Sequence, residues 1–141
     1  MTDIKRRLQA YGEFFEGLTP EDMQRFDRLF SSEIHFKDPF NDVRGVAALK
    51  QVFTHMFEQC VNPRFRVLDH CGEGDRGYLY WSFHFTPRGR TGERVLEGVS
   101  RVIFDAQGRV VEHIDYWDPA EQLYSQIPLL GPVLDFVRSR L

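Results

Sequence analysis

The stretch Arg109–Pro119, with the sequence RVVEHIDYWDP, alternates like a β-strand but carries ionisable residues on both of its faces. Successive side chains of a strand point to opposite faces, so Val111, His113, Asp115 and Trp117 share one face. The inner face of a half-buried strand is ordinarily apolar, whereas this face combines an imidazole, a carboxylate and an indole. The pattern predicts a polar spot in a concave surface with aromatic walls.

Upstream of this stretch, the chain has the pattern of a series of strands separated by turns. The turn sequences GEGDRG and PRGRTG are rich in glycine and polar residues, which favours hairpin connections. Alternation places Trp81, Phe83 and Ser100 on the faces that continue toward the core or a pocket. The candidate strands are residues 64–71, 78–86 and 93–105.

Three helices are predicted ahead of these strands, at residues 3–17, 19–30 and 46–60. The first and third have apolar residues at helical spacing. The second begins with Thr-Pro-Glu-Asp, which combines an N-cap, a proline at the first helical position and acids in the first turn. A helical tail is expected within residues 127–141. This order predicts an α+β fold, with helices on one face of an antiparallel sheet.

A short strand ending at Asp38 separates the second helix from the third. Phe36 and Asp38 share one face of that strand, and Pro39 keeps Asp38 extended because its ring disfavours a helical conformation there. Tyr11 on the first helix and Phe53 on the third lie on the apolar sides of their helices. We therefore expect residues of both helices and of this strand to approach the polar spot.

The composition fits a single globular domain spanning residues 1–141. A chain of 141 residues with 42% hydrophobic and 14% aromatic content can bury a sizeable core. Its 13 phenylalanines suit a protein that lines a cavity as well as filling a core. A small apolar or carbonyl-bearing molecule is the expected partner.

Charge, hydropathy and motif spacing argue against several other classes of protein. The net charge of -3 disfavours a nucleic-acid surface, which needs clustered lysine and arginine. No run is apolar enough to cross a bilayer or to act as a signal peptide, so we expect a cytoplasmic protein without membrane association. Cys60 and Cys71 are too few for a disulfide framework. The histidines lack zinc-site spacing and no phosphate-binding glycine loop is present, so neither a metal nor a cofactor is expected.

The order of helices and strands, together with the segments FKDPF and DYWDP, resembles the SnoaL-like polyketide cyclases of the nuclear-transport-factor-two-like superfamily. The resemblance covers essentially the whole chain and rests on pattern more than on any single motif. It implies a cone-shaped half barrel, in which three N-terminal helices pack on a curved antiparallel sheet, with a helical tail at the C-terminus. A pocket is expected at the open end of the cone.

The resemblance also implies roles for individual residues. Ketosteroid isomerase, in the same superfamily, has an aspartate base before a proline, which matches Asp38, and a tyrosine donor matched by Tyr11. Its second, protonated aspartate falls near Ser100, so the isomerase oxyanion hole is incomplete here and steroid isomerisation is not predicted. In SnoaL-like cyclases an inward aspartate of the last strand acts as acid and base, and Asp115 matches it, with His113 on the same face.

Each candidate also has a purely structural interpretation. Asp115 is either a desolvated general base or a carboxylate that pairs with arginine or caps a loop. Asp38 is either a base or a turn former. His113 by itself would be a core histidine, and only its position beside Asp115 makes it a catalytic candidate. Tyr11 serves equally for packing, as do the expected pocket walls, which are Phe36, Phe53, Trp81, Phe83 and Trp117 with Ser100.

Three functions are consistent with these residues. The first is a cofactor-independent enzyme in which Asp38 or Asp115 moves a proton next to a carbonyl group, giving isomerisation or ring closure. A variant has the same carboxylates activate water, as in epoxide hydrolysis, and requires a nearby arginine. The second is a binding protein for an apolar ligand. The third is an interaction module, a homodimer formed through the outer face of the sheet at Val95, Val99 and Ile103.

Overall fold

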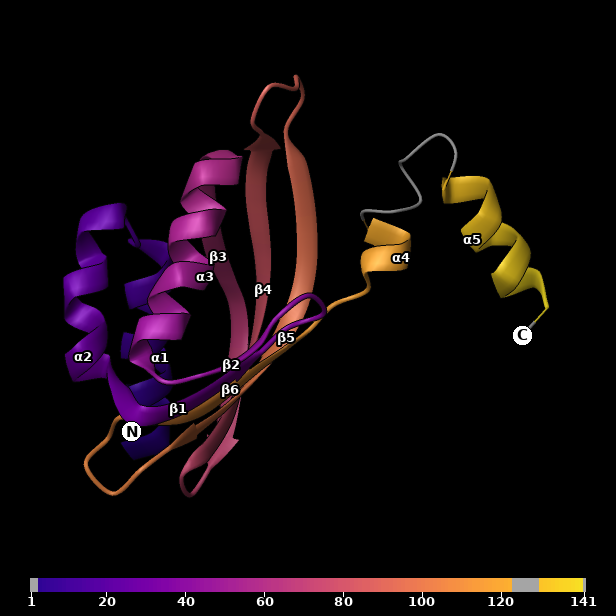
Figure 1. The fold of residues 1–141 in the computed structure, drawn as a ribbon. Helices are drawn as coiled ribbons and strands as arrows, with labels where there is room; N and C mark the ends of the chain where they lie inside the picture. The colour runs from indigo at the N-terminus through magenta and orange to yellow at the C-terminus, as the bar shows by residue number, and fades with distance from the viewer. Residues whose placement is uncertain (1–2, 123–129, 141) are drawn as a thin grey trace.

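The computed structural model describes residues 3–122 and 130–140, which form an α+β cone (Figure 1). The α+β class and cone shape expected from the sequence are confirmed. The helices are α1 (Asp3–Glu16), the 3₁₀ helix η1 (Pro20–Arg25), α2 (Phe26–Leu29), α3 (Val46–Gln59), α4 (Pro119–Gln122) and α5 (Leu130–Ser139). The strands are β1 (Phe30–Lys37), β2 (Asp42–Arg44), β3 (Cys60–Glu73), β4 (Arg76–Pro87), β5 (Arg94–Phe104) and β6 (Val110–Tyr116).

The second expected helix is divided into two short pieces. Its start is as the sequence predicts, because the Thr19 backbone N–H and hydroxyl both donate to the Asp22 carboxylate at 2.9 Å. These hydrogen bonds close a 3₁₀ turn, and only the residues from Phe26 onward are α-helical. The chain then enters β1 directly at Phe30, which is buried, so β1 begins earlier than the sequence pattern indicates.

The strands form one sheet in the order β2-β1-β6-β5-β4-β3. Hairpins make most neighbouring pairs antiparallel, but β1 and β6 run parallel, which is possible because the helix α3 and four strands connect them. This parallel pairing brings Phe36 of β1 opposite His113 of β6. Segments from the two ends of the chain thereby build one region of the concave face.

Irregularities in the strand register curve the sheet around the helices (Figure 1). One lies between Val67 and Asp69 in β3, and another lies between Ile103 and Phe104 of β5 against β6. A bulge bends its strand and increases the local twist. The β6 bulge also makes Val110 rather than Val111 a core residue, and from His113 onward the expected alternation holds.

Helix α1 closes the narrow side of the cone against β3 and β4. Its buried side carries Ile4, Leu8, Tyr11 and Phe15, as the helical spacing predicts. The helix approaches β4 so closely that a Cβ built at Gly77 would lie 2.5 Å from the Leu8 side chain. Only glycine fits there, and its small size brings the Tyr11 side of α1 down onto the sheet.

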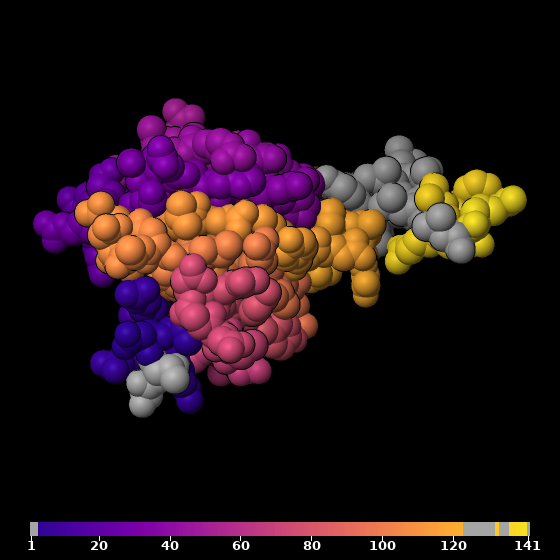
Figure 2. Space-filling model, turned by 90° about the horizontal axis from the view of Figure 1, so that it is seen from below, coloured from indigo at the N-terminus to yellow at the C-terminus, as the bar shows by residue number. Residues whose placement is uncertain are grey.

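The C-terminal helix α5 stands apart from the cone in both views (Figures 1 and 2). Helix α4 remains attached to the sheet, because the Gln122 side-chain amide donates to the Glu97 carbonyl at 3.0 Å and accepts from the Glu97 N–H at 2.5 Å. Part of the expected tail, residues 127–129 and 141, lies outside the described residues. None of the described helices is long and apolar enough to cross a membrane.

Candidate functional site

Asp115 is the centre of a hydrogen-bond chain on the concave face of the sheet. Its Oδ1 lies 2.7 Å from His113 Nε2 and accepts a hydrogen bond from the Ser100 hydroxyl at 2.5 Å. Ser100 is opposite Asp115 in the β5–β6 pairing, and His113 precedes Asp115 by two residues on the same face. Oδ2 accepts no hydrogen bond from any described residue. The carboxylate is therefore held by one oxygen and available through the other.

Tyr11 holds the far side of the His113 ring. The Tyr11 hydroxyl lies 2.7 Å from His113 Nδ1, and both side chains are buried. Burial, followed by the negative charge of Asp115, raises the pKa of Tyr11 well above its ordinary value of 10.0. A protonated phenol donates to Nδ1, which assigns the proton of a neutral imidazole to Nε2, where it is donated to Asp115. The order of donors is thus Tyr11, His113 and Asp115 as final acceptor.

Trp81 orients Ser100, the other hydrogen-bond partner of Asp115, as Tyr11 orients His113. The Trp81 indole N–H donates to the Ser100 hydroxyl oxygen at 2.8 Å, so the hydroxyl hydrogen is directed at Asp115. The indole lies flat across β5 because Gly98 is opposite Trp81 in the β4–β5 pairing. A Cβ at Gly98 would come within 2.6 Å of the indole ring. The site consequently depends on a glycine that makes no polar contact with it.

Aromatic rings enclose the chain of hydrogen bonds. The Phe36 ring stacks on the His113 imidazole with ring centroids 5.1 Å apart and an interplanar angle of 27°. The centroid of the Phe15 ring lies 5.9 Å from the centroid of the same imidazole. The side chains of His113 and Asp115 are only 6% and 16% exposed. The carboxylate therefore meets solvent through a restricted opening.

Asp115 opens onto a cavity of about 340 Å³. This volume lies in the range of small-molecule sites. Aromatic and aliphatic residues of β1, α3, β3, β4 and β5 form most of its wall, and Phe40 and Trp117 meet edge to face at 5.4 Å beside it. The wall includes Phe36, Asp38, Phe40, Asn41, Phe53, His55, Met56, Phe65, Trp81, Phe83, Phe85, Leu96, Asp115 and Trp117.

Asp38 also lines this cavity, but its carboxylate is engaged by its own turn. Oδ1 accepts hydrogen bonds from the backbone N–H groups of Phe40 and Asn41 at 2.8 and 2.7 Å. The Asn41 side-chain amide lies 3.0 Å from Oδ1 and 3.1 Å from Oδ2. These contacts are those of an aspartate that shapes the turn between β1 and β2. Asp38 and Asp115 thus border one cavity with very different hydrogen bonding.

The expected wall residues divide into three positions. Phe36, Phe53, Trp81, Phe83 and Trp117 line the larger cavity. Ser100 lies deeper, with His113, against a second and smaller space. Tyr11 lines neither of these spaces, because it lies behind the His113 ring.

Sequence reasoning did not single out Gly98, Phe65 or the last turns of α3. Phe65 contributes to both spaces from β3, and Met56 and Gln59 of α3 line the larger one. The spacing of Phe53, Met56 and the end of α3 indicates which face of this helix points inward. It does not indicate that a cavity lies beside that face. Gly98 breaks an otherwise regular strand, and a glycine within a strand signals close approach of another group.

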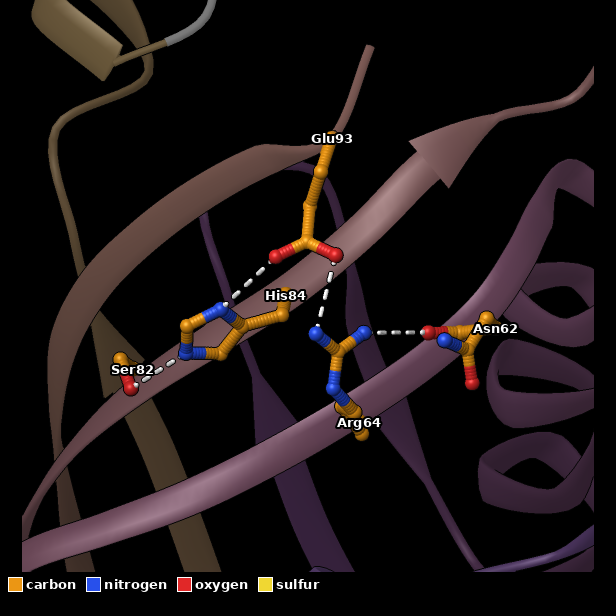
Figure 3. A network of polar contacts seen from close by, with 5 residues as sticks. All are labelled: Asn62, Arg64, Ser82, His84 and Glu93. Atoms are coloured by element: carbon orange, nitrogen blue, oxygen red, sulfur yellow. Dashed lines mark hydrogen bonds and ion pairs between the residues drawn. The ribbon is translucent and has the colours of Figure 1, made fainter. Parts of the chain in front are cut away.

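A second polar cluster lies on the opposite, convex face of the sheet (Figure 3). The Ser82 hydroxyl is 3.0 Å from His84 Nε2, and His84 Nδ1 is 3.3 Å from Glu93 Oε1. Arg64 donates to Glu93 Oε2 at 2.9 Å and to the Asn62 carbonyl at 3.2 Å. Serine, histidine and glutamate follow the order of a nucleophile, a base and an acid that orients the base.

This cluster lacks the other parts of a hydrolytic site. Strand β4 pairs with β3 and β5 on its two sides, so the backbone N–H groups around Ser82 belong to the sheet ladder and none is left for an oxyanion. The Glu93 carboxylate instead links β3 and β4 to the start of β5. We interpret the cluster as a set of polar contacts that holds three strands together. Among the described residues, no group of three histidine, cysteine, aspartate or glutamate side chains could hold a metal ion.

The fold and the enclosed carboxylate define a cone-shaped α+β protein with a cavity on the concave face of its sheet. The family profile described as the SnoaL-like domain matches residues 11–113, which is more than half of the chain. The chain therefore belongs to the SnoaL-like family, as the resemblance of its sequence pattern predicts. No curated protein matches it significantly.

Solved structures share this fold at low sequence identity. A protein from Shewanella denitrificans OS-217, described as a SnoaL-like polyketide cyclase, is 20% identical with a TM-score of 0.71, covering 89% of this chain and 100% of its own. A Catenulispora acidiphila protein with a ketosteroid isomerase-like fold is 12% identical, with a TM-score of 0.71 and coverage of 83% and 88%. An LEH-like epoxide hydrolase from M. tuberculosis is 15% identical, with a TM-score of 0.67 and 94% coverage of each chain.

Proposed function

We propose that the protein is a cofactor-independent enzyme that moves a proton next to the carbonyl group of an apolar small molecule, with Asp115 as general base and acid. The observation that carries this proposal is the asymmetry of the Asp115 carboxylate. Oδ1 is held by His113 and Ser100, whereas Oδ2 has no partner among the described residues, and Asp115 lines the cavity. A base must be fixed in position and still reach its substrate.

In the proposed reaction, Asp115 Oδ2 removes a proton from the carbon next to the carbonyl. The electron pair of that C–H bond moves to form an enolate, and Asp115 returns the proton to the same carbon or, in a β,γ-unsaturated ketone, to the γ carbon as the double bond moves into conjugation. In a substrate with a second carbonyl, the enolate carbon can instead bond to that carbonyl carbon and close a ring; the C=O π pair moves to its oxygen, which takes the proton from Asp115. His113 and Tyr11 act as positioning residues, because His113 contacts Asp115, Tyr11 contacts His113, and neither lines the larger cavity.

Asp38 is the less suitable base. Four contacts with Phe40 and Asn41 already engage its carboxylate. Removing its negative charge would weaken the turn that forms one side of the cavity mouth. We assign Asp38 to shaping the cavity and Asp115 to proton transfer.

The epoxide hydrolysis variant needs an arginine beside the carboxylate, and no arginine is among the described residues that line either space. A binding protein without chemistry would use the same walls. Structures such as the LEH-like epoxide hydrolase share the fold only and do not decide between these functions.

The test is deuterium exchange into ethyl 2-naphthyl ketone in D₂O, followed by proton NMR, with styrene oxide hydrolysis measured in parallel. We expect exchange at the carbon next to the carbonyl, and its loss in Asp115→Asn. Asparagine keeps an acceptor for His113 and Ser100, so the variant should stay folded. Diol formation from styrene oxide would favour the water-activating enzyme. Tight ketone binding with no exchange in the wild type would leave the binding protein as the better account.

A further inference from the structure

A second, smaller space lies beyond Asp115, toward α1. Its volume is about 30 Å³, which is room for one small group. The residues around it come from α1, α3 and four strands, so it lies deep in the cone. They are Phe15, Phe53, Phe65, Val67, Leu79, Trp81, Ser100, His113 and Asp115. We call this space the inner chamber and the larger one the outer cavity.

The two spaces share part of their walls, and Asp115 belongs to the shared part. Four residues, Phe53, Phe65, Trp81 and Asp115, border both of them. Phe65 and Trp81 meet edge to face at 5.9 Å, which makes the partition rigid and aromatic. Of these four shared residues, only Asp115 carries a charge. A molecule that occupies both spaces would therefore meet one charged group in the shared wall, the Asp115 carboxylate.

The inner chamber suits an apolar group better than a water molecule. A buried water needs two to four polar partners, about three on average. The polar atoms of Ser100 and His113 are already engaged with Asp115, Trp81 and Tyr11. Asp115 Oδ2 is the one side-chain oxygen of the chamber's wall left without a partner among the described residues. The rest of the wall is phenylalanine, valine and leucine.

We infer that the inner chamber is a binding subsite for a short alkyl group of the ligand, one or two carbons long. The outer cavity then holds the larger apolar body, about two rings in size, since a cavity of about 150 Å³ accommodates benzene. The carbonyl and its acidic carbon lie between the two spaces, next to Asp115. This inference rests on the proposed function for the carbonyl, and it narrows the substrate class to compact alkyl ketones.

Val67 sets the depth of the chamber. It lies at the β3 bulge, where its backbone N–H donates to the Glu16 carboxylate at 3.0 Å. Behind it, a Cβ at Gly12 would come within 3.1 Å of the Val67 Cγ2 atom. Val67 thus packs close to the α1 backbone at Gly12, which restricts its movement away from the chamber, so we expect ligand length to be limited at this residue. Val67 takes no part in the hydrogen bonds of Asp115 and does not line the outer cavity. A substitution at Val67 should therefore change the inner chamber alone.

The test is the binding of methyl, ethyl and propyl 2-naphthyl ketones by equilibrium dialysis, with naphthalene as the control ligand. In the wild type we expect similar affinity for the methyl and ethyl ketones and about tenfold weaker binding of the propyl ketone. Val67→Ala should restore propyl ketone binding. Val67→Ile should weaken ethyl ketone binding by about tenfold while the methyl ketone still binds. Naphthalene affinity should stay within about twofold in all three proteins, since naphthalene fills only the outer cavity.

Equal affinity of the wild type for all three ketones would overturn the inference, as would parallel changes for naphthalene and the ketones. If Val67→Ile does not fold, Val67→Ala and the wild type still decide the question. Repeating the series with Asp115→Asn separates this inference from the proposed function. In Asp115→Asn the limit on alkyl chain length should persist, whereas deuterium exchange into the ketone should be lost. If the wild type shows the limit on alkyl chain length but no deuterium exchange, the subsite is supported and the proposed enzyme activity is rejected.

Discussion

At the scale of single residues, the molecule joins Tyr11 and Asp115 through one imidazole. Strand alternation predicts that His113 and Asp115 share a face, since they are two positions apart. It cannot predict that Tyr11 is the partner of His113, because the two residues are separated by 102 positions in the sequence and meet only through the docking of α1 on the sheet. Helical spacing indicated that Tyr11 points inward, but not what it contacts.

Replacing Tyr11 with phenylalanine should change how stability depends on alkaline pH. The pKa of Tyr11 is raised in the folded protein, so the unfolded chain loses this proton first as pH rises above about 10. The wild type should then lose up to about 1.4 kcal/mol of unfolding free energy per pH unit relative to Tyr11→Phe. Below that pH, Tyr11→Phe should be about 1–3 kcal/mol less stable, because His113 Nδ1 loses its donor.

Urea unfolding at a series of pH values between neutral and strongly alkaline measures both effects. The control is Tyr116→Phe, at an exposed tyrosine of the same sheet, which should follow the wild type at every pH. Identical alkaline slopes for the wild type and Tyr11→Phe would show that the phenol ionises as freely in the folded protein as in the unfolded chain.

At the scale of elements, β4 and β5 form the site by pairing a residue with a large side chain with a glycine, which has no side chain. Trp81 and Gly98 are opposite each other, and the indole fills the place of the missing side chain before reaching Ser100. The alternation of both strands can be read from the sequence, but register cannot, so the role of Gly98 emerges only once the strands are paired. The turn at Asp38 is a similar case, because its proline indicates a turn but not a cavity wall.

Gly98→Ala should destabilise the protein by about 1–3 kcal/mol, the usual range for forcing a methyl group into a filled space. Trp81→Phe removes the ring atoms within 2.6 Å of the new Cβ, so the same substitution should cost less in that background. A double-mutant cycle measured by urea unfolding gives this coupling. Additive effects of the two substitutions would mean that the indole does not depend on Gly98 for its position.

At the scale of the whole molecule, the cone has one face toward the helices and another on which several apolar or aromatic side chains are exposed. Tyr78, Tyr80, Val95, Val99 and Tyr116 are exposed apolar or aromatic residues on β4, β5 and β6. The cone, its curvature and its concave site follow from helix and strand periodicity together with glycines and bulges. A partner for the convex face would be another molecule, and periodicity carries no information about such a partner.

We propose that two copies associate through this convex face, as the alternation of β5 suggests. Val99→Glu should then shift sedimentation from dimer to monomer, because a charge directly inside a self-associating face is repeated on both copies. Val61→Glu, at an exposed valine of the edge strand β3, is the matched control and should sediment as the wild type does. A wild type that sediments as a monomer at high protein concentration would rule out the dimer.

The central claim is that Asp115, and not Asp38, transfers the proton. The most direct measurement compares the rate constant of deuterium exchange into ethyl 2-naphthyl ketone for the wild type, Asp115→Asn and Asp38→Asn, all at saturating ketone. We expect a loss of about 10²-fold or more for Asp115→Asn, the usual contribution of a general base, and a change of no more than a few-fold for Asp38→Asn. A loss confined to Asp38→Asn would contradict it.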